Sequence, residues 1–124
     1  MVDAVTRDRD PSAFLPLSPQ QFEILLALAD QDLHGYGIIL DVSARTSGRI
    51  RLGTGPLYTA IARLAANGLI RETDRRDEQD ARRRYYTLTK LGRATLAAET
   101  ARLEALVAKA RRRGIRPSAV KERS

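Results

Sequence analysis

The segment from Gly53 to Ile70 constrains the fold more than any other part of the chain. Pro56 lies where the first turn of a helix tolerates proline, and Asn67-Gly68 provides a stop, because glycine easily adopts the left-handed conformation that ends helices. Leu69-Ile70 then begins an apolar strand. We therefore expect a helix that begins at Thr54 or Gly55 and ends at Asn67, followed directly by a strand over 69–73.

A second strand is predicted over 84–88, with residues 74–83 as a basic hairpin loop between the two. Helix, strand, basic hairpin and strand in this order are the layout of a winged helix-turn-helix, a mainly α fold with a small β-hairpin wing. The 54–67 helix should bury a stripe formed by Leu57, Ala60, Ile61 and Leu64. Its opposite side is small, with Tyr58 and Arg63 standing out, and such a side can approach the bases and phosphates of a DNA groove closely.

Two further helices are expected before this segment. The first begins at Ser18, which forms a capping box with Gln21, and ends near Asp30. After a turn at 33–37 the second should end near Gly48 and pack on the first through Tyr36, Ile39 and Leu40. The single histidine, His34, is better interpreted as a hydrogen-bonded turn residue than as a metal ligand.

The C-terminal helix, predicted over 89–113 with Thr89 as its cap, is too long for a core of this size to bury alone. Its apolar residues repeat at a spacing of seven, which favours pairing with another helix. We expect it to form a homodimer together with the first helix. The residues assigned to this pairing are Phe22, Leu96, Ala98, Leu103, Leu106, Val107 and Ala110.

Charge gives weaker guidance. The net charge of +7 favours an anionic partner, but residues 69–84 contain six arginines and five acids, and much of the positive charge lies in residues 111–124. The chain has no cysteine and one histidine, so we expect no metal site, cofactor or catalytic set, and no enzyme activity. No apolar run is long enough for a membrane span, which favours a cytoplasmic protein.

These patterns divide the chain into four parts. They are a disordered N-terminal arm (1–13), a DNA-binding domain (14–88), a dimerisation helix (89–113) and a basic flexible tail (114–124).

Three ordered motifs resemble the PadR family of bacterial transcriptional regulators. They are Leu33–Ile38, the segment from Gly55 to Leu64 that leads into Gly68-Leu69-Ile70, and Arg83–Thr89 followed by Gly92-Arg93. The resemblance covers residues 17–112 and implies a homodimeric repressor released by a small molecule or another signal, which would bind between the first and last helices. The family commonly has Gly-Thr-Leu-Tyr where this chain has Gly55-Pro56-Leu57-Tyr58, so one hydroxyl is lost there, and Thr54 and Thr59 are the candidates to supply it instead.

The partner expected from these observations is double-stranded DNA with a pseudo-palindromic operator. The residues that we expect at the interface are Arg45, Arg49, Arg51, Thr54, Gly55, Pro56, Tyr58, Thr59, Arg63, Arg82, Arg83 and Arg84. The alternatives are ordinary ones: Tyr58 could pack on the wing, Arg63 could be a solvated surface residue, and the wing arginines could pair with neighbouring acids. Two other functions stay open at this point, a winged-helix protein-interaction module that never binds DNA and non-specific nucleic-acid compaction by the basic tail.

Overall fold

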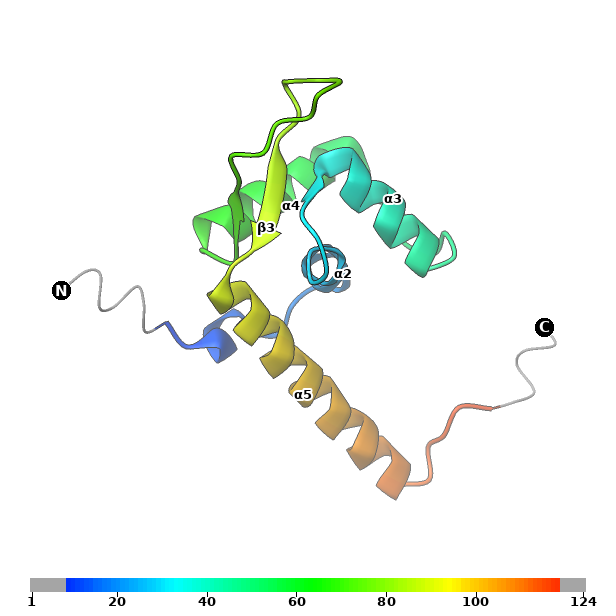
Figure 1. Ribbon diagram of the computed structural model, residues 1–124. Helices are drawn as coiled ribbons and strands as arrows, with labels where there is room; N and C mark the ends of the chain where they lie inside the picture. Colours follow the sequence, from blue (N-terminus) through cyan, green and yellow to red (C-terminus); the bar gives the residue numbers. More distant parts are fainter. Residues whose placement is uncertain (1–8, 119–124) are drawn as a thin grey trace.

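A computed structural model describes residues 9–118 and confirms the expected fold class. The elements are η1 (Pro11–Phe14), α2 (Pro19–Ala27), β1 (Leu33–His34), α3 (Gly35–Arg45), α4 (Thr54–Ala66), β2 (Ile70–Glu72), β3 (Tyr85–Leu88) and α5 (Lys90–Arg112). Figure 1 shows α2, α3 and α4 gathered beside the small sheet, the hairpin loop projecting from one end, and α5 running away as a long rod. We call residues 70–88 the wing.

The starts of the helices follow the capping chemistry expected from the sequence. The Oγ of Ser18 accepts the Gln21 N–H at 3.0 Å, and the Gln21 side chain accepts the Ser18 N–H at 3.0 Å. The Oγ1 of Thr89 accepts the Gly92 N–H at 2.9 Å. The ends are less well predicted, because α2 ends at Ala27 and α3 at Arg45, earlier than Asp30 and Gly48.

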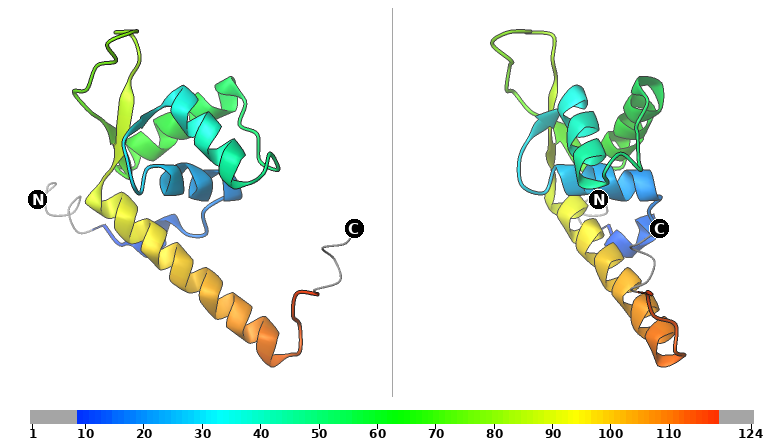
Figure 2. Two further views of the ribbon diagram at one scale, coloured as in Figure 1. Left: turned by 45° about the vertical axis from the view of Figure 1, so that its right-hand side comes forward. Right: turned by 90° about the vertical axis from the view of Figure 1, so that its right-hand side faces the viewer.

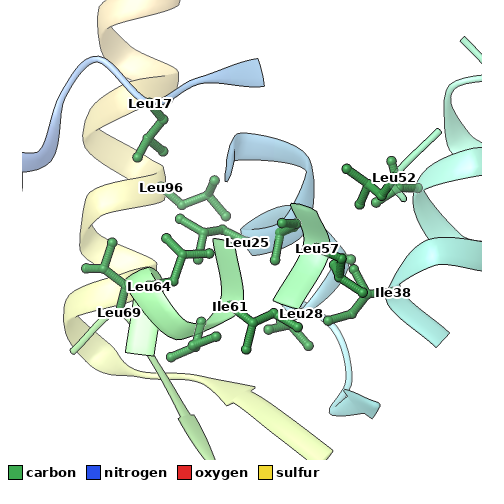
Figure 3. Packing of buried hydrophobic residues seen from close by; sticks show 14 residues of the cluster. Leu17, Leu25, Leu28, Ile38, Leu52, Leu57, Ile61, Leu64, Leu69 and Leu96 are labelled. Atoms are coloured by element: carbon green, nitrogen blue, oxygen red, sulfur yellow. The ribbon is translucent and has the colours of Figure 1, made fainter. Parts of the chain in front are cut away.

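The core lies where α2, α3 and α4 meet the first turns of α5 (Figure 3). Leu57, Ile61 and Leu64 line the inner side of α4 and are at most 4% exposed. Burying each such side chain stabilises the fold by about 1.5–3 kcal/mol. The predicted α4 stripe is therefore confirmed, with Ala60 at its partly buried edge.

The buried face of α3 corrects one prediction. Ile38 and Val42 are fully buried, whereas Tyr36 and Leu40 are more than half exposed. Residues two apart on a helix lie about 200° around its axis, so the two pairs face opposite ways. Of the three residues expected to pack inward, only Ile39 does so, in part.

The sheet has one strand more than the sequence indicated. Its order is β1-β3-β2, and β1 pairs with β3 through Leu33 opposite Tyr86 and His34 opposite Tyr85. On the other side β2 places Glu72 opposite Tyr86. The stretch predicted as a turn therefore begins as a short strand, which carries His34 to the base of the wing.

The N-terminal segment also differs from the expectation. Residues 1–8 of the predicted arm lie outside the described residues, but Pro11–Phe14 form η1, with Asp10 accepting the Ser12 N–H as its cap. This segment packs along α5 (Figure 2), and the carboxylate of the buried Glu99 accepts the Leu17 N–H at 3.0 Å. Arg102 pairs with the same carboxylate and lowers the pKa of Glu99. A buried hydrogen-bonded charge thus joins the segment to the helix.

The start of α5 depends on the absence of a side chain at Gly92. A Cβ there would lie 2.0 Å from the Leu69 carbonyl oxygen, which is backbone and cannot move aside easily. We expect Gly92→Ala to lower the free energy of unfolding by about 2 kcal/mol or more, although alanine favours helices. Gly55→Ala is the matched control, because nothing lies within 4 Å of its Cβ position, and it should be neutral or slightly stabilising. Urea denaturation measures both, and equal effects would contradict the packing argument.

Candidate nucleic-acid interface

The outward side of α4 is polar and accessible. Tyr58, Thr59 and Arg63 are exposed there, with Tyr58 47% accessible, while the reverse side of the helix is buried in the core. Thr54, Gly55 and Pro56 are exposed in the first turn. All six α4 residues that the sequence assigned to the interface are thus exposed.

Tyr58 is held from behind by the start of α3. Its ring packs so closely on Gly35 that a Cβ at residue 35 would lie 2.3 Å from the tyrosine hydroxyl oxygen. Glycine at 35 therefore lets the ring rest against α3, and the tyrosine is positioned although it is half-exposed.

A hollow of about 430 Å³ separates α4 from the wing, and we call it the wing groove. Tyr58 stands on its α4 side, and Tyr86 stands on its strand side. Burial raises the pKa of the Tyr86 hydroxyl, with a further contribution from Glu72, so this group stays a neutral hydrogen-bond donor near neutral pH. The residues that line the groove are His34, Gly35, Tyr36, Tyr58, Asp80, Arg82, Arg83, Arg84 and Tyr86.

A second hollow, of about 460 Å³, lies on the other flank of α4. Thr59 and Arg63 face the start of α2 across it, where Gln20 contributes a polar side chain. None of its lining residues is acidic; they are Ser18, Gln20, Gln21, Pro56, Thr59, Ala60 and Arg63. The outward side of α4 is thus a ridge between two hollows, and each hollow is lined by both polar and apolar groups.

The three predicted wing arginines are all paired with acids of the wing. Arg82 meets Asp80, Arg83 meets Asp77 and Arg84 meets Glu72, each at 3.2 Å. The wing arginines therefore do not present three uncompensated positive charges to solvent.

Tyr85 and Tyr86 point to opposite faces of β3, as the strand period requires. Tyr85 is buried beneath the wing loop, where Arg75 stacks over its ring at 4.1 Å from the centroid and its hydroxyl donates to Asp77 at 3.4 Å. His34 packs edge-on against the same ring. This small cluster, which the sequence did not reveal, fixes the base of the wing.

His34 connects α3 to the wing. Its Nδ1 accepts the Gly37 N–H at 3.0 Å and caps α3, and its Nε2 lies 3.1 Å from Nη1 of Arg83. The prediction of a hydrogen-bonded turn residue is confirmed. Burial lowers the pKa of His34, the cations Arg83 and Arg75 lower it further, and Asp77 opposes them.

The arginines that precede α4 differ in how many partners their guanidinium groups have. Arg45 bonds to Asp41 at 2.7 Å and to Glu23 at 2.6 Å, so its guanidinium joins α3 to α2. Arg51 donates to the Gly48 carbonyl at 3.3 Å. Arg49 is exposed and has no side-chain partner within residues 9–118. Arg49 and Arg51 are thus better placed than Arg45 to turn toward an anion.

The far half of α5 carries an apolar strip. Leu103 is 37% exposed and Val107 51%, and together with Phe22 of α2 they line a hollow of about 410 Å³. Leu106 is also exposed, and Ala98 and Ala110 are half-buried. Leu96 differs from the expectation: it is 8% exposed and packs in the core of its own chain, because α2 covers this part of α5.

Two further features are absent from the described part of the chain. Residues 9–118 contain no group of three or more metal-ligating side chains of the His, Cys, Asp or Glu type. Within the same residues, no helix combines the length and apolar character that crossing a membrane requires.

The small sheet, the three-helix core and the ridge on α4 define a winged helix-turn-helix protein. The model of the transcriptional regulator PadR-like family matches residues 24–98, so the chain belongs to this family, and the resemblance inferred from its motifs is confirmed. Proteins of this family are transcriptional regulators.

The chain is also similar to individual proteins. The chain is 44% identical over 79 residues to an uncharacterized 37.1 kDa protein in transposon TN4556 of Streptomyces fradiae, a match that covers 64% of this chain and 21% of the relative. The match thus spans about a fifth of that relative's length. A transcriptional regulator from Clostridium thermocellum superposes with a TM-score of 0.65 at 28% identity, covering 78% of this chain and 90% of that one.

Bacillus subtilis PadR, solved in complex with operator DNA, superposes with a TM-score of 0.59 at 22% identity over 67% of this chain and 47% of that one. At this identity the likeness shows the fold alone.

The position of His34 predicts a pH-dependent stability. Since folding lowers the pKa of His34 from its ordinary value of 6.5, the neutral ring stabilises the fold above that pH, and this contribution is lost as the pH falls. We expect the Tm of the wild type to fall more than that of His34→Asn between about pH 7.5 and 5.5, because asparagine can cap a helix without titrating. Parallel Tm curves for the two proteins would show that His34 does not carry this dependence.

Proposed function

We propose that this protein is a sequence-specific DNA-binding transcriptional regulator that acts as a homodimeric repressor. The observation that carries the proposal is the polar ridge of α4, which leaves Tyr58, Thr59 and Arg63 accessible between two hollows. A helix inserted in the major groove has a phosphate backbone on each side, and the two hollows lie on the two flanks of α4. The solved complex of Bacillus subtilis PadR with operator DNA supports this use of the fold.

In this proposal the residues divide by role. Tyr58, Thr59 and Arg63 reach base edges or nearby phosphates, and the exposed start of α4 (Thr54, Gly55, Pro56) lets the DNA backbone approach closely. The phosphate contacts come from Arg49 and Arg51 on one side and from Arg82, Arg83 and Arg84 on the other. Arg45 acts mainly by holding α3 against α2.

The homodimer uses the apolar strip of α5. Exposed Leu103, Leu106 and Val107 lie beyond the part of the helix that the core covers, and a second copy of the chain would remove them from water. A two-fold axis between the copies requires a pseudo-palindromic operator whose half-sites are about 34–36 Å apart, or a multiple of that distance. A small apolar molecule that enters the hollow beside Phe22 would change the angle between the copies and release the DNA.

The DNA-binding role of α4 is tested by Tyr58→Phe and Arg63→Ala. Each removes one polar contact without removing the core packing, and we expect operator affinity to fall by about 1–3 kcal/mol while the dimer persists. Gel shifts with the DNA upstream of the gene measure the effect. Lys109→Ala removes one positive charge from the distant half of α5 and serves as the control. If all three variants bind like the wild type, α4 is not the reading helix.

The dimer is tested by Leu103→Asp. A carboxylate within the apolar strip would lose its hydration on pairing, so we expect monomers in light scattering with an unchanged circular dichroism spectrum. Ala97→Asp introduces the same charge at an exposed position in the first half of α5, outside the residues assigned to pairing, and should leave the dimer intact. Dimers in both variants would place the interface elsewhere.

A further inference from the structure

The wing carries its arginines together with carboxylates that neutralise them. Arg82, Arg83 and Arg84 each have an acid at 3.2 Å, and these acids are Asp80, Asp77 and Glu72 in turn. A guanidinium binds carboxylate and phosphate through the same forked geometry. Each acid therefore pairs with a guanidinium that could otherwise bind the DNA backbone.

Unlike the other two acids, Glu72 makes no hydrogen bond that shapes the hairpin loop. Asp77 accepts the Gln79 N–H at 2.7 Å, and Asp80 accepts the Arg82 N–H at 3.0 Å, so both shape the hairpin loop. Within residues 9–118 the Glu72 carboxylate accepts no backbone hydrogen bond, and Arg84 is its only ion-pair partner. Both side chains of this pair are about half exposed, so the pair stabilises the fold little.

The pair also lies at the proposed DNA face. Glu72 is directly opposite Tyr86 in the sheet, on the same side of the strands, and Tyr86 and Arg84 line the wing groove with Tyr58 of α4. A phosphate that followed this flank of α4 would approach Arg84 and meet the Glu72 carboxylate beside it.

We propose that Glu72 competes with the DNA backbone for Arg84. The Glu72 carboxylate pairs with Arg84 in the free protein and thereby limits binding to DNA of arbitrary sequence. The inference rests on the proposed DNA-binding function. When Arg84 turns to a phosphate, the released carboxylate takes up a cation, which cancels part of the counterion release that drives binding. Non-specific binding consists almost entirely of this electrostatic term, so it is affected most.

The test compares Glu72→Gln with Glu78→Gln in the full chain. Glu78 is exposed in the wing loop and has no partner within the described residues, so its variant removes the same charge without freeing an arginine. The probe is a short duplex of arbitrary sequence, titrated by fluorescence anisotropy between about 50 and 200 mM salt. We expect Glu72→Gln to bind about fivefold more tightly, with a salt slope steeper by about 0.9, and Glu78→Gln to gain about twofold at most.

A double-mutant cycle with Arg84→Ala separates pairing from general charge. In the Arg84→Ala background, Glu72→Gln should gain no more than Glu78→Gln does, because there is no guanidinium left to release. The inference is overturned if the two glutamine variants gain equally, or if the larger gain survives in that background. Absence of binding to this duplex by the wild type and every variant would also overturn the inference, whereas the proposed function fails only if the DNA upstream of the gene is not bound either.

Discussion

The burial of three side chains on α4 determines what the rest of the surface can do. Leu57, Ile61 and Leu64 are packed against α2 and α3 so completely that α4 cannot rotate about its axis without exposing them. Their spacing of three and four residues leaves the opposite side of the helix to Tyr58, Thr59 and Arg63. The face proposed to bind DNA is thus set by the hydrophobic effect on the other side of the same helix.

The long helix α5 divides its residues between two environments. Its first turns belong to the core of their own chain, where Gly92 meets the Leu69 backbone and Leu96 is buried. Its far half is flanked by Phe22 of α2 on one side and carries exposed leucine and valine. The buried Glu99 lies at the boundary, and its hydrogen bond to Leu17 ends the part of the helix that the core supports. One helix can therefore join a folded unit to a partner without a flexible linker.

The sequence predicted the features that depend on local chemistry. The caps at Ser18 and Thr89, the α4 stripe and the winged layout all follow from residues a few positions apart, and all are found. The buried face of α3 was predicted wrongly, because Tyr36, Ile38, Ile39, Leu40 and Val42 are all apolar or aromatic and offer no polar side to fix the rotation. Pairing of β1 with β3 depends on residues some fifty positions apart, so no local pattern signals it.

The candidate site shows the same limit. The sequence placed the arginines of the wing, but it did not say which acid each would meet. The pairing of Arg84 with Glu72 follows from the register of β2 and β3, since Glu72 faces Tyr86, two residues beyond Arg84. A single-residue slip of that register would turn Glu72 to the other face of the sheet and leave Arg84 unpaired. The charge on the surface of the wing is therefore a property of strand alignment, which the count of basic and acidic residues does not contain.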